Sequence, residues 1–155
     1  ELHMLGRYPA MLTPIVSGGK LLAIHRTYLG DGCKANVPTP KKLTAAAGPL
    51  AGACIPLAAP HGGVLGIAEG IETAAAASLG SGLPVVAAYC ANALAGFAFP
   101  RGIERLVIFA DHDPAGQQAG ATLAQRATRA GLTSKTLTPS KPGSDWADVW
   151  LEGMQ

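Results

Sequence analysis

Two apolar runs lie near the start of the chain, between positions 9 and 29, and the sequence Ser17-Gly-Gly-Lys20 joins them. Glycine tolerates the positive φ angles that tight hairpin turns need, so this segment predicts a β-hairpin. From Gly30 to Gly63 the chain is rich in Gly, Pro and Ala and shows no sustained hydrophobic period. That stretch is expected to be a connector with only short elements.

After position 63, short apolar runs alternate with helical patterns. The clearest helix starts at Pro114, because apolar or small residues recur at helical spacing as far as Ala130, and Gly131 then ends it. Strands that alternate with helices over short connections predict an α/β fold, with a parallel sheet covered by helices on both faces. We therefore expect a β-rich basic segment at 1–60 and an α/β domain at 61–155. The expected strands are 64–68, 85–89, 106–110 and 134–138, and the expected helices are 71–79, 92–97, 114–130 and 146–151.

The composition is that of a folded protein without a membrane segment. Hydrophobic residues make up 48% of the 155 positions and charged residues only 14%. No stretch approaches the roughly 18 apolar residues that a membrane span needs, and the first residues lack a secretion signal. The three cysteines form no C-x-x-C pair, which argues against a zinc ribbon or a disulfide framework. We therefore expect a soluble protein of the reducing cytoplasm, with no membrane partner.

Charge is distributed unevenly, although the formal net charge is only +2. Up to Pro60 the basic residues outnumber the acidic ones, and from His61 onward the acidic residues are in excess. Such an arrangement is expected if a polyanion binds over a metal site, but ordinary solvated loops explain the charge equally well. The basic residues of the first part are Arg7, Lys20, Arg26, Lys34, Lys41 and Lys42.

Acidic residues follow the predicted strands of the second part. Glu69 ends the first strand, Asp111 ends the third with Asp113 two residues later, and Asp145 and Asp148 come after the fourth. In parallel α/β sheets, ligands bind outside the carboxyl ends of the strands. Five carboxylates are therefore expected to gather at one edge of the sheet.

Carboxylates gathered in this way repel one another unless cations neutralise them or some of them stay protonated. Oxygen ligands of this kind suit Mg²⁺ or Mn²⁺. The chemistry that this predicts is phosphoryl or nucleotidyl transfer. Gly70, directly after Glu69, would let the backbone approach a phosphate closely.

The same acids also have structural interpretations. Asp113 precedes a proline, a combination that starts helices, and Asp145 is likewise placed to cap a helix that has Asp148 in its first turn. Asp111 and Glu69 instead end apolar strands, where there is no helix for them to cap. The structural interpretation is therefore weaker for these two than for the other three.

Three stretches together resemble the Toprim domain, a metal-dependent fold shared by bacterial primases, topoisomerases and certain nucleases. They are EGIETA at 69–74, ADHDPAG at 110–116 and PGSDWAD at 142–148. The sequences of these three motifs are most similar to those in the Toprim domains of phage- and plasmid-type DNA primases, which are often fused to helicases. The upstream stretches 6–11 and 25–29 also resemble the segment that precedes Toprim in those proteins.

The resemblance implies a DNA primase catalytic domain, which synthesises primers on single-stranded DNA by Mg²⁺-dependent nucleotidyl transfer. Glu69 would be the general acid or base and would bind metal together with Asp111 and Asp113. Asp145 and Asp148 would support a second ion.

Two residues depart from the family pattern. His112 stands where a small residue or Asn is more usual, and its side chain is expected to point away from the acids, because side chains alternate at strand spacing. Ala147 stands where Asn is common. The zinc-binding module that usually precedes such a domain is missing from the sequence. We therefore expect a fragment, fused to or partnered with a helicase and a zinc-binding module.

The expected ligands are a single-stranded DNA template and nucleoside triphosphates, held by phosphate contacts. Two other functions remain open, a Toprim nuclease that cleaves phosphodiester bonds and a non-catalytic module that binds DNA or nucleotide. A flavodoxin-like domain with helix caps and no metal is a fourth interpretation. The candidate nucleotide or DNA contacts are Arg26, Lys34, Lys41, Lys42, Gly70 and Lys141.

Overall fold

The computed structural model describes residues 6–154, and the chain divides into two compact units, Glu1–Leu50 and Ala51–Gln155. The division lies before the expected boundary at position 60. Part of the reason is that Ile55, which precedes position 60, pairs with Ala87 in the second unit. Within the described residues, no helix is long and apolar enough to cross a membrane.

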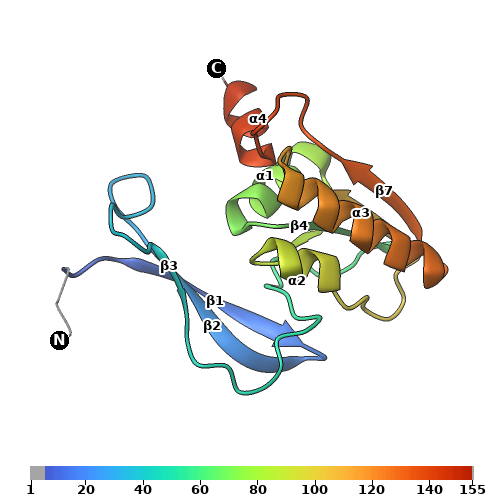
Figure 1. Ribbon diagram of the computed structural model, residues 1–155, viewed down its shortest axis with the longest axis horizontal. Helices are drawn as coiled ribbons and strands as arrows, with labels where there is room; N and C mark the ends of the chain where they lie inside the picture. Colours follow the sequence, from blue (N-terminus) through green and yellow to red (C-terminus); the bar gives the residue numbers. More distant parts are fainter. Residues whose placement is uncertain (1–5, 155) are drawn as a thin grey trace. The chain divides into compact units, whose positions relative to one another are not determined.

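The first unit contains a three-stranded antiparallel sheet in the order β1-β2-β3 (Figure 1). The strands are β1 (Ala10–Ser17), β2 (Lys20–Tyr28) and β3 (Lys41–Leu43). The predicted hairpin is confirmed, and Gly18 and Gly19 turn it with φ angles of 55° and 76°. The short strand β3 arises from the stretch expected to be a connector.

The second unit contains a four-stranded parallel sheet in the order β5-β4-β6-β7. Each strand and helix predicted for this unit is present, with ends shifted by at most two residues. The strands are β4 (Val64–Ala68), β5 (Val85–Ala87), β6 (Arg105–Phe109) and β7 (Thr133–Leu137). The helices are α1 (Ile71–Ser81), α2 (Ala91–Gly96), α3 (Pro114–Arg129) and α4 (Trp146–Glu152).

Helices cover both faces of the parallel sheet, as the sequence predicts. α1 packs on β4 and β5 and against α4, whereas α3 packs on β6 and β7 and against α2 (Figure 1). The chain runs from β4 to β5 in one direction and from β5 past β4 to β6 in the other, so right-handed crossovers put α1 and α2 on opposite faces. Neighbouring strands β4 and β6 therefore form the topological switch point, where such sheets bind ligands.

The two central strands are buried on both faces, which explains their continuous apolar sequences. Leu65 in β4 is 1% exposed and Leu106 in β6 is fully buried. Gly66 has a packing role, because a Cβ at this position would lie 2.8 Å from Cγ2 of Val85 and 3.1 Å from the ring of Phe109. A side chain there would force β4 or the residues around it to move.

Candidate metal centre

Glu69 and Asp111 lie at the switch point of the parallel sheet. β4 and β6 pair with Ala68 opposite Phe109, so Glu69 follows one strand directly and Asp111 follows the other two residues later. Both acids are half-buried. Gly70 comes next to Glu69 as the N-cap residue of α1, in an extended conformation with φ −95° and ψ 161°. Two acids from adjacent strands thus reach the ligand-binding edge.

The carboxylate of Asp111 lies where its charge is disfavoured. Burial, and then the negative charges of Glu69, Asp145, Asp113 and Asp148, raise the pKa of Asp111 from 3.8 to about 7. Its Oδ1 atom is buried and has no hydrogen-bond partner among the described residues. The structure therefore brings the other four acids within electrostatic reach of Asp111, whose Oδ1 has no hydrogen-bond donor in residues 6–154.

The start of α3 packs closely on the backbone of Asp111. A Cβ at Gly116 would lie 2.9 Å from the carbonyl oxygen of Asp111 and 3.1 Å from its Cβ, so this position favours glycine. Asp113 caps the helix, as predicted: its Oδ1 accepts a 2.7 Å hydrogen bond from the Gly116 amide, and Pro114 is the first helical residue. This cap uses one carboxylate oxygen of an exposed side chain.

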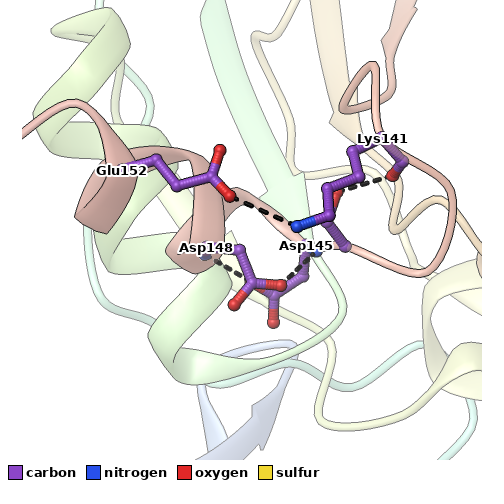
Figure 2. A network of polar contacts seen from close by, with 5 residues as sticks. Lys141, Asp145, Asp148 and Glu152 are labelled. Carbon is purple, nitrogen blue, oxygen red and sulfur yellow. Dashed lines mark hydrogen bonds and ion pairs between the residues drawn. The ribbon is translucent and has the colours of Figure 1, made fainter.

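Asp145 and Asp148 form a capping box at the start of α4 (Figure 2). Oδ1 of Asp145 accepts from the amides of Ala147 at 2.7 Å and Asp148 at 2.9 Å, and Oδ2 of Asp148 accepts from the Asp145 amide at 3.1 Å. The predicted cap is confirmed. In the same view, Nζ of Lys141 lies 3.5 Å from Oε1 of Glu152, in a mostly exposed ion pair that contributes little.

His112 connects the end of β6 to the loop before α4. Its Nδ1 lies 2.8 Å from the carbonyl oxygen of Pro139 and, because a carbonyl only accepts, Nδ1 carries the proton. Its amide donates to the carbonyl of Ser144 at 2.9 Å, and its own carbonyl accepts from the Gly143 amide at 2.8 Å. These bonds hold the loop before α4 against His112, the residue between Asp111 and Asp113.

An aromatic pair joins the same two segments. The rings of Phe109 and Trp146 meet edge to face, with centroids 5.6 Å apart and an interplanar angle of 88°. Phe109 precedes Asp111 by two residues, and Trp146 directly follows Asp145. The ring contact therefore fixes the start of α4 to the end of β6.

Two residues at this edge were not predicted from the sequence. Thr73, in the first turn of α1, donates from Oγ1 to Oδ2 of Asp145 at 3.3 Å. Tyr89, shortly after β5, has a φ of 68°, a conformation that is rare for large side chains and concentrates at functional sites. The hydrogen bond of Thr73 could not be predicted, because its acceptor is 72 positions away in the sequence. The positive φ of Tyr89 could not be predicted either, because a hydrophobic pattern contains no information on the backbone angles of a single residue.

The predicted phosphate contacts of the first unit lie on or beside its sheet. Arg26 in β2 is directly opposite Lys42 in β3, and Lys41 occupies the adjacent position of β3. Lys34 lies in the segment between these strands. These four residues belong to the first unit, and the five acids belong to the second.

The donors at the carboxyl edge fit a divalent cation. They are all carboxylate oxygens, which Mg²⁺ and Mn²⁺ prefer. The buried Oδ1 of Asp111 has no hydrogen-bond donor among the described residues, and a bound cation would take the place that such a donor would fill. Within residues 6–154, no three His, Cys, Asp or Glu side chains already converge into a ligand cage. Mg²⁺ does not require one, because it keeps several waters and is held by one or two carboxylates together with substrate phosphates.

The parallel sheet, its switch point and the acids beside it define a Rossmann-like α/β domain with an acidic centre. The sequence matches the Toprim domain family over residues 64–154, and it matches a domain of unknown function (DUF7146) over residues 2–55. The chain therefore belongs to the Toprim family. A search of curated proteins finds no match.

Solved structures of DNA primases have the same fold. The DNA primase domain from Pseudomonas aeruginosa is similar with a TM-score of 0.60 and 14% identity, over 92% of this chain and 47% of that one. The DnaG catalytic core gives 0.63 and 16%, over 92% and 48%. The primase fragment of the bacteriophage T7 primase-helicase protein gives 0.58 and 18%, over 88% and 54%. The chain thus spans about half the length of these primase chains.

Proposed function

We propose that this chain is the catalytic part of a DNA primase of the phage or plasmid type, which joins nucleotides on single-stranded DNA with Mg²⁺. The observation that carries the proposal is the buried, unpartnered Oδ1 of Asp111, at a switch point with four further acids around it. Acids with a capping role have hydrogen bonds from amides, as Asp113 and Asp145 do. Asp111 has the surroundings of a group that a cation satisfies, and the fold shared with primase domains supports the same reaction class.

The five acids have different tasks in this proposal. Asp111 and Asp113, with Glu69, hold one ion, and Asp145 and Asp148 support a second. Bound Mg²⁺ supplies the positive charge that stabilises phosphoryl transfer. Glu69 acts as the general base that takes the proton from the attacking hydroxyl, or as the acid that returns it.

The basic residues of the first unit are proposed to bind the DNA template. Arg26 and Lys42 are directly opposite each other on paired strands, where like charges repel. A backbone phosphate between the two side chains would remove this repulsion, and Lys34 and Lys41 would extend the contact along the DNA.

Gly70 and Lys141 are proposed as contacts for the triphosphate. Gly70 opens α1, so the first amides of that helix lie beside Glu69 and are suited to a phosphate. Lys141 is exposed and pairs only weakly with Glu152. Its ammonium group can therefore leave the Glu152 carboxylate and bind a phosphate of the nucleotide. In the cell, the proposal places the protein in the cytoplasm and makes a helicase and a zinc-binding module its fused or separate partners.

A de novo priming assay tests the proposal. The whole chain is incubated with single-stranded DNA, labelled ribo- or deoxyribonucleoside triphosphates, and Mg²⁺ or Mn²⁺. Metal-dependent primers are expected, and they should be absent when Glu69→Gln is combined with Asp111→Asn. Glu104→Gln is the matched control, because this exposed acid precedes β6 at the opposite edge of the sheet. Full activity of the double variant would contradict the mechanism.

Incubation of labelled single- and double-stranded DNA with Mn²⁺, without triphosphates, separates synthesis from cleavage. Cleavage without synthesis identifies a Toprim nuclease. Saturable binding of DNA or nucleotide without either reaction identifies a binding module. Both outcomes overturn the primase proposal.

A further inference from the structure

The Thr73 hydroxyl differs from other helical threonine hydroxyls of this protein. Thr122 and Thr128 in α3 donate to the carbonyl four residues earlier, to Gln118 at 2.9 Å and to Ala124 at 3.1 Å. This bond within the helix is the ordinary choice for a helical threonine. Thr73 is in the first turn of α1, and its hydroxyl instead donates to a carboxylate at the start of another helix.

The acceptor of this bond is Oδ2 of Asp145, at 3.3 Å. Oδ1 of the same carboxylate already accepts from the amides of Ala147 and Asp148. Because a carboxylate oxygen offers about two lone pairs, the cap fills Oδ1, and Thr73 takes one of the two sites on Oδ2. One site on Oδ2 is left, and its direction depends on the hydroxyl that shares the atom.

Thr73 is also held firmly enough to direct another side chain. It is 3% exposed, and a Cβ at Gly70 would lie only 3.3 Å from its Oγ1, so the turn after Glu69 packs closely against the hydroxyl. The helix that starts beside Glu69 thereby makes a side-chain hydrogen bond to the helix that starts with Asp145.

From this geometry we infer that Thr73 is a positioning residue: its hydroxyl aims the remaining site of Asp145 Oδ2 at the second proposed ion, which Asp145 and Asp148 support. The inference rests on the proposed metal-dependent function. Because the Thr73 hydroxyl donates to Asp145, it would act on the ion through that carboxylate. Loss of the hydroxyl should weaken metal binding more than it slows the reaction at saturating metal, because partners that orient a ligand tune its affinity.

Thr73→Val removes the hydroxyl and keeps the branched shape of the side chain, and Thr73→Ser keeps the hydroxyl. In the whole chain, Mn²⁺ binding measured by calorimetry should weaken about tenfold in Thr73→Val and recover within about twofold in Thr73→Ser. The Mg²⁺ concentration that gives half-maximal primer synthesis should rise by a similar factor, with kcat at saturating Mg²⁺ changed much less. Thr128→Val is the matched control, because it loses a hydroxyl bond within α3, and it should bind metal as the wild type does.

Asp145→Asn supplies the background that separates positioning from folding. In that background Thr73→Val should have no further effect on Mn²⁺ affinity, whereas a general loosening of the fold would weaken binding in both backgrounds. If Thr73→Val unfolds, the same comparison is made with Thr73→Ala. A wild-type protein that neither binds Mn²⁺ nor makes primers refutes the proposed function. A wild type that does both, alongside a hydroxyl-free variant with unchanged Mn²⁺ affinity, refutes the positioning role alone.

Discussion

The end of β6 and the start of α4 both present an aspartate at the carboxyl edge of the sheet, but the two carboxylates have opposite surroundings. Asp145 accepts two amide hydrogen bonds at Oδ1 and a threonine hydroxyl at Oδ2. Asp111 has a buried Oδ1 without a partner among the described residues, and its pKa is raised by burial and by four neighbouring acids. Without metal, the carboxylate of Asp145 stabilises the fold and that of Asp111 destabilises it. The hydrogen bonds that each acid receives therefore distinguish a helix cap from a site that needs a cation.

Asp111→Asn tests this comparison with the largest expected effect. Primer synthesis should fall about 10³-fold, because a metal-bound carboxylate takes part in several kcal/mol of charge stabilisation. The metal-free variant should nevertheless be more stable than the wild type, since the substitution removes a charge that burial, and then four other acids, disfavour. Initial rates and urea unfolding midpoints give the two quantities. Asp31→Asn in the first unit serves as the control, and a loss of both activity and stability in Asp111→Asn would show a structural role.

The pH dependence of stability tests the same carboxylate without relying on activity. The pKa of Asp111 is about 7 when folded and 3.8 is its ordinary value, so the folded protein binds this proton more tightly than the unfolded chain. The stability that the proton contributes is complete below about pH 4 and is lost as the pH rises through about 7. Allowing for partial exposure of the carboxyl, the loss should be about 2 kcal/mol.

The measurement for this prediction is the difference between wild type and Asp111→Asn in urea unfolding from pH 4 to pH 8, in buffer that contains a chelator. The difference should favour the variant increasingly above pH 5. Added Mg²⁺ should reduce it at pH 8. A difference that is flat with pH contradicts a raised pKa at this position.

Asp145 should respond in the opposite direction, by a smaller amount. Asp145→Ala removes the acceptor of two amide bonds at the start of α4 and should destabilise the metal-free protein by about 1 kcal/mol. Asp145→Asn keeps a capping oxygen and should lie within a few tenths of a kcal/mol of the wild type. Urea unfolding at pH 8 provides the comparison. Equal destabilisation by both variants would mean that the charge, and not the cap, is what α4 needs.

Lys141 is expected to have the smallest effect on stability. Its pair with Glu152 is largely exposed, so Lys141→Gln and Glu152→Gln should each change the free energy of unfolding by less than about 0.5 kcal/mol, and less still in high salt. The proposed contact with triphosphate predicts that only the lysine variant raises the KM for nucleotide. Steady-state kinetics on the two variants measures this, and an equal rise in both would remove Lys141 from the nucleotide site.

The second unit could be predicted from the sequence because its elements are encoded locally. The apolar run at 64–68 is β4 with the expected ends, and the aspartate-proline pair at 113–114 starts α3 as the cap rules predict. The first unit was predicted less completely. Its hairpin follows from two glycines, but the three residues of β3 carry no pattern, and they become a strand by pairing with β2.

The sequence could place acids at strand ends but could not say how each one is satisfied. Asp145 receives its third hydrogen bond from a residue 72 positions away, and His112 holds a carbonyl 27 positions away. Such pairs depend on which helix packs beside which strand. No local propensity contains that information.

The sequence by itself determined the α/β class, the positions of the strands and helices of the second unit, and which five carboxylates follow its strands, because side-chain period and helix signals act over a few residues. Only the tertiary structure decided that β4, β6 and β7 are neighbours, so that these acids share one charge environment, and that the buried Oδ1 of Asp111 has no hydrogen bond within the described part of the chain. The physical reason is that desolvation, repulsion and hydrogen bonding depend on distances through space, and these are set by the packing of segments far apart in the chain.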